Sequence, residues 1–230
     1  MRLDRFLQAR LACSTRAVHH MLAERKVLLN GVVVDSGRRD ISGFCRVEVE
    51  GRVLQARQPI YLMLHKPRGC VSATIDSRHP TVLDLIDLPS KEQLHLAGRL
   101  DFNTTGLLLL TNDGNWSRRI TLPQRKIAKT YRVETKDEIT AQYVQTFAAG
   151  IHFRFENLTT LPAELRLISA NTAELTLHEG RYHQIKRMFG LFQNEVIGLH
   201  RLSMGSIVLD AGLLPGQYRH LSPAEVESIL

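Results

Sequence analysis

The sequence predicts an α+β protein with two domains. From residue 60 onward, segments with strand and helix periodicity follow one another without the regular βα repeat of a parallel sheet. The first 58 residues carry two short helical patterns and then a hairpin signal. The chain has 230 residues, 43% of them hydrophobic, which is enough apolar material for a small domain over 1–58 and a larger one over 59–230.

Two short helices open the predicted small domain. The apolar side chains of the first helix share one face: Leu3, Phe6, Leu7 and Leu11. Ser14 is the predicted N-cap of the second helix, whose apolar side holds Val18, Met21 and Leu22. The polar face of this pair is basic, with Arg2, Arg5, Arg16 and Arg25.

A small hairpin-rich sheet is predicted next. In VLLNGVVV, Asn30-Gly31 separates two apolar runs, and both residue types tolerate the positive φ angles of a two-residue turn. Residues 51–60, GRVLQARQPI, predict a last strand and a short connection that ends at Pro59.

The larger domain is predicted to contain several strands and a closing helix. YLMLHKPRGCVSAT, residues 61–74, predicts a strand, a Pro-Arg-Gly break and a second strand. The four leucines at 107–110 are apolar on both faces, which indicates a central strand covered on each side. TYRVET and AELTLHE alternate like half-buried strands. In SPAEVESIL, the positions of Ser222, Pro223 and Glu225 predict a helix N-terminus.

One further helix is predicted around EGRYHQIKRMF. Its buried face would consist of Tyr182, Ile185, Met188, Phe189 and Phe192. The other sides of this helix would then carry His183, Lys186 and Arg187.

The basic residues are unevenly distributed. The formal charge is +7, and residues 1–58 hold eleven Lys and Arg against six Asp and Glu. A compact basic module favours attachment to a polyanion, and nucleic acid fits better than a membrane because no amphipathic Lys-rich helix with an aromatic face is present.

A second basic stretch, between Asp113 and Glu134, contains no acid. Its basic residues are Arg118, Arg119, Arg125, Lys126, Lys129 and Arg132. It predicts a groove for phosphates, with an ordinary solvated loop as the alternative.

Composition and spacing argue against several other classes of protein. No run reaches the roughly 18 apolar residues of a membrane span, and MRLDRFLQAR lacks the apolar middle of a signal peptide, so we expect a cytoplasmic protein. Three widely spaced cysteines fit a reducing compartment rather than a disulfide framework. His178 and His183 have the spacing of half a zinc site, but no partner pair exists, so we predict no metal.

A single acid stands in a turn before the leucines, in GRLDFNTTGLLLLTNDG, residues 98–114. A P-loop is excluded because Leu107, not Lys, follows Gly106. A calcium loop is excluded because its twelfth position is Asn112 rather than Glu. The residues alone leave two interpretations of Asp101, a turn-stabilising side chain or a catalytic carboxylate at the mouth of a buried strand. A carboxylate there needs a facing cation, and Arg99 is the nearest in sequence.

Two resemblances to known families add to these observations. RLDRFL, the Ser14-Thr15-Arg16 segment and VLLNGVVVDSG together make residues 1–58 similar to an S4-type RNA-binding domain. GRLDFNTTGLLLLTNDG, with HKPRGCVSAT, KTYRVE and EGRYHQIKRMF in this order, resembles the RsuA family of pseudouridine synthases over essentially the whole chain. The resemblance implies a mixed, mainly antiparallel catalytic domain with a central cleft, and isomerisation of uridine in ribosomal RNA without cofactor or metal.

The resemblance also implies roles for particular residues. Asp101 would be the catalytic aspartate, Tyr131 the aromatic residue against the target base, and Lys186 the cation that pairs with the aspartate. Many relatives carry Arg at Lys186 and Asn at His65. The alternative for Tyr131 is an ordinary inward-facing strand tyrosine. We expect the remaining RNA contacts to come from basic side chains, namely Arg99, Arg181, Arg187, Arg118, Arg119, Lys129, Arg2, Arg5 and Arg16.

The residues of the motif YHQIKRMF are more similar to the small-subunit branch of that family. The expected partner is therefore small-subunit (16S) ribosomal RNA, bare or in a partly assembled small ribosomal particle, and the expected state is a monomer. Two alternatives stay open: a non-catalytic RNA-binding or assembly factor, and the same reaction on large-subunit RNA. A metal-dependent phosphoesterase would need carboxylate or histidine clusters that the sequence does not contain.

Overall fold

The computed structural model of the protein describes residues 1–154 and 156–229. The chain divides into two compact units, Met1–Pro59 and Ile60–Leu230, and each is described by itself. The division falls one residue beyond the boundary predicted from the sequence.

The first unit packs two helices on a small sheet. Helices α1 (Leu3–Leu11) and α2 (Thr15–Ala23) precede the strands β1 (Val27–Leu29), β2 (Val32–Val33), β3 (Val47–Val49) and β4 (Arg52–Gln55), which pair in the order β2-β1-β3-β4. The Ser14 hydroxyl accepts a hydrogen bond from the Ala17 N–H, so the predicted N-cap is confirmed. Asn30 and Gly31 form the predicted turn, with φ angles of 51° and 82°. The assignment of this unit to the S4 type stays a prediction.

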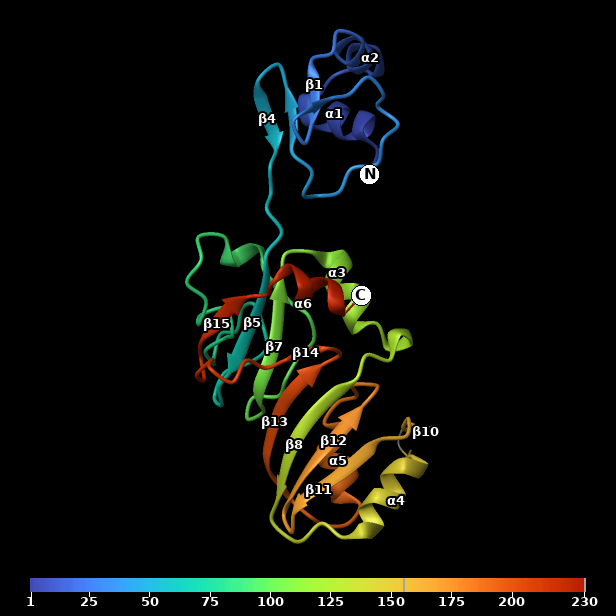
Figure 1. Cartoon of the computed structure of the whole chain (residues 1–230), viewed down its shortest axis with the longest axis vertical. Coiled ribbons are helices and arrows are strands. Elements are labelled where there is room, and N and C mark those ends of the chain that lie inside the picture. The colour runs from blue at the N-terminus through green and yellow to red at the C-terminus, as the bar shows by residue number, and fades with distance from the viewer. Residues whose placement is uncertain (155, 230) are drawn as a thin grey trace. The chain divides into compact units, whose positions relative to one another are not determined.

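The second unit is built on one mixed sheet (Figure 1). In the described part of the chain, nine strands belong to this sheet, in the order β11-β12-β8-β13-β7-β5-β15, with β14 paired to β13 and β6 paired to β7. Their bounds are β5 (Tyr61–Lys66), β6 (His95–Leu96), β7 (Thr105–Thr111), β8 (Lys129–Thr135), β11 (Glu164–Ser169), β12 (Thr172–Leu177), β13 (Val196–Met204), β14 (Ile207–Val208) and β15 (Tyr218–His220). Among these strands β13 and β7 are parallel and the other pairs are antiparallel, which confirms the mainly antiparallel α+β fold.

The leucine run lies in the centre of this sheet and separates two cores. Leu108 and Leu110 face one core, whereas Leu107 and Leu109 face the other, and all four are fully buried. Alternate residues of a strand point to opposite faces, so the run satisfies both cores at once. The sequence prediction of a strand covered on each side is confirmed.

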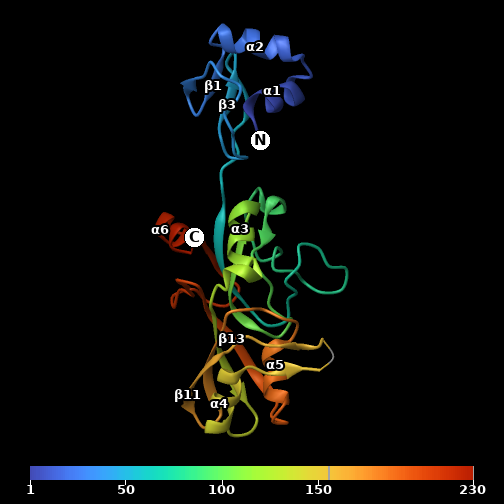
Figure 2. The same ribbon diagram turned by 90° about the vertical axis from the view of Figure 1, so that its right-hand side faces the viewer.

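Helices cover both faces of the sheet. α4 (Ala141–Ala149) and α5 (Gln184–Gly190) contribute aromatic and aliphatic side chains to the core of Leu108. α3 (Gly114–Thr121) and the C-terminal α6 (Pro223–Ser228) pack on the core of Leu107, so α5 and α6 lie on opposite sides in Figure 2. Ser222 and Glu225 form the predicted capping box of α6. The remaining elements are short: β9 (His152–Phe153), β10 (Leu158–Thr159) and the 3₁₀ turns Lys91–Gln93 and Pro123–Arg125. The three cysteines are free.

The second strand predicted after the Pro-Arg-Gly break does not form. Only one β-bridge, Val71 to Thr81, occurs there. Ser72 instead bonds the segment to the Asp101 turn, because its hydroxyl donates to the Leu100 carbonyl at 2.7 Å and accepts from the Leu100 N–H at 3.0 Å. These side-chain hydrogen bonds take the place of a strand ladder.

The helix predicted around EGRYHQIKRMF is shorter than expected. It begins at Gln184, because His183 has a left-handed φ of 49° and ends the turn before it. Tyr182 was predicted on the buried face, but it lies outside the helix and is 79% exposed. Ile185, Met188 and Phe189 are buried as predicted, whereas Phe192 follows the helix and is partly buried.

Candidate active site

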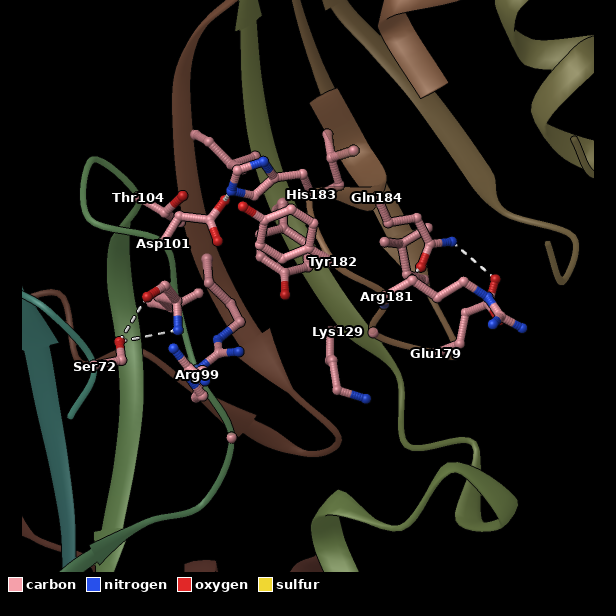
Figure 3. Close-up of a pocket in the computed structure, with 18 of the residues that line it drawn as sticks. Ser72, Arg99, Asp101, Thr104, Lys129, Glu179, Arg181, Tyr182, His183 and Gln184 are labelled. Atoms are coloured by element: carbon pink, nitrogen blue, oxygen red, sulfur yellow. Dashed lines mark hydrogen bonds and ion pairs between the residues drawn. The ribbon is translucent and has the colours of Figure 1, made fainter. Parts of the chain in front are cut away.

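A pocket of about 680 Å³ opens in the second unit, beside the turn that carries Asp101. Its walls come from the 98–104 turn, from strands β8 and β13, and from the segment between β12 and α5. Asp101, Tyr131 and Lys186, the three predicted catalytic residues, all line it. Figure 3 shows Asp101 and His183 on the same side of this pocket. A volume of this size is typical of a small-molecule or nucleotide site.

Backbone constraints hold the Asp101 turn in place. Gly98 and Gly106 flank it with φ angles of 100° and 101°, a region that L side chains rarely adopt. Gly106 also lies against the backbone of β13, where a Cβ atom would come within 2.3 Å of the Arg201 carbonyl oxygen. The Asp101 carbonyl accepts from the Thr104 N–H at 3.0 Å and closes the turn. The glycines of the motif therefore serve the geometry of the carboxylate.

A buried lysine also stabilises the Asp101 turn through hydrogen bonds to its backbone. Lys66, at the end of β5, is fully buried and donates through Nζ to the carbonyls of Pro67, Phe102 and Thr104 at 2.9–3.2 Å. Burial lowers the pKa of the Lys66 ammonium, while Cys70 and Asp101 favour its charged form. With Ser72 on the other side, the turn is bonded on both flanks before any substrate arrives.

A lysine and a histidine side chain face the Asp101 carboxylate. Asp101 Oδ2 lies 3.6 Å from His183 Nε2 and 3.9 Å from Lys186 Nζ. These separations are those of ion pairs rather than of short hydrogen bonds, and the three side chains are 34–40% exposed. The carboxylate oxygens are therefore electrostatically matched yet open to a ligand in the pocket.

Tyr131 forms part of the pocket wall. It belongs to β8, is 8% exposed and pairs across the strands with Arg201 of β13. The neighbours Arg132 and Glu134 are exposed, in agreement with the alternation predicted for this strand. An aromatic side chain buried in a strand with one edge on a pocket suits a flat heterocycle.

Arg99 does not serve as the predicted counter-charge. Its side chain lines the pocket, but among the described residues no ion pair joins it to Asp101. The turn between them points the two side chains to different parts of the pocket, as Figure 3 shows. His183, for which the sequence predicted no role, holds the place next to Asp101 instead.

Two other predicted RNA-binding residues line the same pocket. Lys129 donates to the Ile127 carbonyl at 2.8 Å, and burial followed by the charge of Arg201 lowers the pKa of its ammonium. Arg181 pairs with Glu179 at 2.9 Å and is exposed at the rim.

The remaining predicted RNA-binding residues lie elsewhere. Arg187 is bonded to Glu156 at 2.6 Å and stacks on the Phe153 ring, so it contacts these two side chains rather than the pocket. Arg118 and Arg119 are exposed in the last turn of α3, outside the pocket lining. Arg2, Arg5 and Arg16 are exposed in the first unit, with Arg2 paired to Asp4.

Sequence reasoning missed His183, although it lies only three residues before Lys186 in the same motif. His183 precedes α5 in a left-handed conformation, so helical periodicity does not predict that it faces Asp101. Tyr182 stacks on the His183 ring at 3.9 Å and is exposed at the pocket, where an aromatic face can meet a base. The His65 ring lies outside the pocket lining, with Nδ1 2.7 Å from the Leu213 carbonyl oxygen.

The described residues bring together no group of three or more His, Cys, Asp or Glu that could hold a metal ion. His178, one half of the zinc spacing noted in the sequence, has its Nδ1 3.0 Å from the Lys126 carbonyl, while His183 faces Asp101. Across residues 1–154 and 156–229, none of the helices has the length and apolar character needed to cross a bilayer.

Sequence comparison identifies the family. Residues 60–190, which include all three predicted catalytic positions, match the family described as RNA pseudouridylate synthase. The chain belongs to this family. A pseudouridylate synthase of known crystal structure is 40% identical, with a TM-score of 0.74 and complete coverage of both chains.

Full-length relatives of this pseudouridylate synthase carry a more specific name. The ribosomal small subunit pseudouridine synthase A of Pseudomonas aeruginosa is 54% identical over 230 residues, with both chains completely covered. The protein of the same name from Escherichia coli K12 is 41% identical over 231 residues, again with complete coverage. The resemblance inferred from the motifs is therefore confirmed, and the reaction class is the isomerisation of uridine to pseudouridine in RNA.

Proposed function

We propose that this pseudouridine synthase acts on small-subunit (16S) ribosomal RNA and that the carboxylate of Asp101 carries out the reaction. The observation that supports the catalytic role most directly is the position of Asp101, which a bonded turn holds at a pocket and which the side chains of Lys186 and His183 face. The choice of RNA rests on the names of relatives that match the chain from end to end.

The isomerisation of uridine requires few catalytic groups from the protein. The C1′–N1 bond of uridine breaks, the uracil turns, a C1′–C5 bond forms, and the proton on C5 leaves while N1 gains one. Nothing is lost from the site, so a positioned carboxylate and a path for one proton suffice. The carboxylate works on the ribose or on the base by one of three routes: attack at C1′, addition to the uracil, or removal of a ribose proton.

Each neighbour of Asp101 has a proposed part in this reaction. Lys186 offsets the charge of the carboxylate, and the His183 ring beside it helps to keep the carboxylate oriented toward the ribose. Tyr131 receives the uracil once the nucleotide has left its stack, a step that costs a few kcal/mol. Arg99, Lys129 and Arg181 line the same pocket and are placed to meet the flanking strand.

The first unit is proposed as an RNA-docking module. Its exposed arginines Arg2, Arg5 and Arg16 give it a basic helix pair, and its charge excess exceeds that of the much longer second unit. We propose that the enzyme works as a monomer in the cytoplasm, on bare RNA or on a partly assembled small ribosomal particle.

Pseudouridine mapping tests this function. Ribosomal RNA is compared from cells with the gene, without it, and with the gene restored as wild type or as Asp101→Asn. We expect one small-subunit uridine to lose its modification on deletion and to regain it only with the wild-type gene. Loss of a large-subunit site instead would overturn the substrate, and full rescue by Asp101→Asn would overturn the catalytic role.

A further inference from the structure

Arg201 is a buried arginine that lines the pocket and was not predicted as a functional residue. It lies in β13 between two site elements, pairing with Tyr131 of β8 on one side and with Gly106 of β7 on the other. Its side chain is almost completely buried, with 2% of the residue exposed. Its Nε donates to the Leu107 carbonyl at 2.7 Å, whereas its Nη2 is buried without a hydrogen-bond partner among the described residues.

An unsatisfied guanidinium nitrogen in this place is costly. Arginine stays protonated in proteins, so burial cannot be relieved by loss of the charge. Buried cations are normally paired, because an uncompensated charge in a low-dielectric site costs several kcal/mol. A buried group of this kind calls for a partner from outside the chain, which can be an ion, an ordered water or a bound ligand.

The acids of the pocket do not supply it. Asp101 faces His183 and Lys186, and Glu179 is engaged by Arg181, by Gln184 and by the Leu161 N–H. In the described residues these are the two carboxylates of the pocket lining, and no ion pair connects either of them to Arg201.

A second cation adds to the positive charge near Arg201. Lys129 lies two residues before Tyr131 in β8, on the same face of the strand, and its pKa is lowered by burial and by Arg201. Its Nζ is bonded to a neutral carbonyl, that of Ile127. In Figure 3 the ends of Lys129 and Arg99 lie away from His183, in the part of the pocket below Asp101.

We propose that Arg201 binds a non-bridging oxygen of a phosphodiester next to the target uridine. This inference rests on the proposed function. Arg201 and Lys129 have no acidic partner, and a phosphate would supply the missing negative charge. A uracil carbonyl would accept the hydrogen bond but would leave the positive charge uncompensated. Because Arg201 pairs with Tyr131, the phosphate lies beside the wall that receives the base. The positive charge is thus placed to fix the nucleotide's backbone while Asp101 acts on its sugar or base.

The test uses neutral linkages in the RNA. A short substrate is made in which one phosphodiester at a time, on either side of the target uridine, is replaced by a methylphosphonate. Binding and single-turnover pseudouridine formation are measured with the wild type, Arg201→Met and Arg201→Lys. We expect one linkage whose neutralisation weakens wild-type binding about 10- to 100-fold, the range of a charge-assisted hydrogen bond. The same linkage should have little further effect in Arg201→Met.

Arg132→Met is the matched control, since Arg132 is exposed on the same strand pair and is absent from the pocket lining. In that variant the sensitive linkage should remain sensitive. Arg201→Lys keeps the charge without the planar fork, so its loss should be intermediate. Thermal melting of each free variant verifies folding, and Arg201→Lys alone carries the test if the methionine variant does not fold.

Three results separate the inference from the function that it extends. If the wild type forms pseudouridine but no linkage is coupled to residue 201, the phosphate contact is overturned and the proposed function stands. If Arg201→Met loses binding while every methylphosphonate is tolerated, Arg201 acts on the base or on the fold, which also overturns the inference. If the wild type forms no pseudouridine in unmodified small-subunit RNA, the proposed function fails first.

Discussion

The close approach of Gly106 to β13 predicts a large difference between two glycine substitutions. Gly98 and Gly106 flank the Asp101 turn and have nearly equal φ angles, 100° and 101°. An alanine Cβ at Gly98 meets nothing within 4 Å. At Gly106 the same atom would lie 2.3 Å from the Arg201 carbonyl oxygen and 2.6 Å from the Arg201 nitrogen.

These distances set the expected energies. Gly98→Ala introduces only an unfavourable backbone conformation, which costs about 1–3 kcal/mol. Gly106→Ala has a similar backbone cost and in addition must push two paired backbones apart, which adds about 1–3 kcal/mol or more. The effect of a methyl group on the unfolded chain is common to both variants and cancels in the comparison. We therefore expect Gly106→Ala to be less stable than Gly98→Ala by at least about 1 kcal/mol.

Denaturant unfolding of the full chain, with a probe in the second unit such as Trp116 fluorescence, measures this difference. Trp116 is buried in the core that Leu107 shares, so its emission reports the sheet around Gly106. Equal stability of the two variants would refute the reasoning, since it would mean that β7 and β13 tolerate a side chain at the contact between Gly106 and the Arg201 backbone.

Three further predictions concern charge. Lys186→Met should slow single-turnover pseudouridine formation roughly 10- to 100-fold. Lys186→Arg keeps a cation near Asp101, so its rate should stay within a few-fold of wild type. Equal losses in the two variants would exclude an electrostatic role for Lys186. Arg219 and Ser222 lower the pKa of Glu225 from 4.5 to about 2, so the ionised side chain stabilises the fold above pH 4.5 and loses this effect as pH falls toward 2. Glu225→Gln should therefore reduce stability by about 1 kcal/mol at pH 7 and by progressively less in acid, and a deficit that does not change with pH in melting experiments would contradict this. Replacing Arg5 and Arg16 together with neutral residues should reduce the slope of log K for RNA binding against log salt concentration. The reduction should be about 0.7–0.9 for each phosphate contact that is lost, and an unchanged slope would exclude the docking role of the first unit.

Local signals in the sequence predicted much of the fold. The Asn30-Gly31 turn, the Ser14 cap and the Ser222 capping box depend on neighbours within a few residues, and all three are confirmed. The leucine run predicted a doubly covered strand because four adjacent apolar residues leave no polar face. The family-specific motifs predicted that Asp101 and Lys186 share one pocket, although 85 residues separate them along the chain.

Features set by an unusual backbone conformation or by distant contacts were missed or predicted wrongly. Tyr182 fits the helical period, but the left-handed conformation of His183 ends that period one residue later. Arg99 is close to Asp101 in sequence, yet the turn directs the two side chains to different parts of the pocket. Arg201 occurs in a polar-looking segment, HRLSM, yet it is buried in the sheet, where its backbone lies directly against Gly106 of β7.

The central claim is that one carboxylate, at Asp101, performs the bond exchange. It is tested most directly by Asp101→Asn with RNA labelled with tritium at uridine C5, under single-turnover conditions and with enzyme concentrations above the measured Kd. Because asparagine keeps the size and the turn but loses the charge, RNA binding should stay within a few-fold of wild type, while tritium release should fall at least about 10⁴-fold, as for other essential catalytic groups. Tritium release within about tenfold of wild type would contradict the claim.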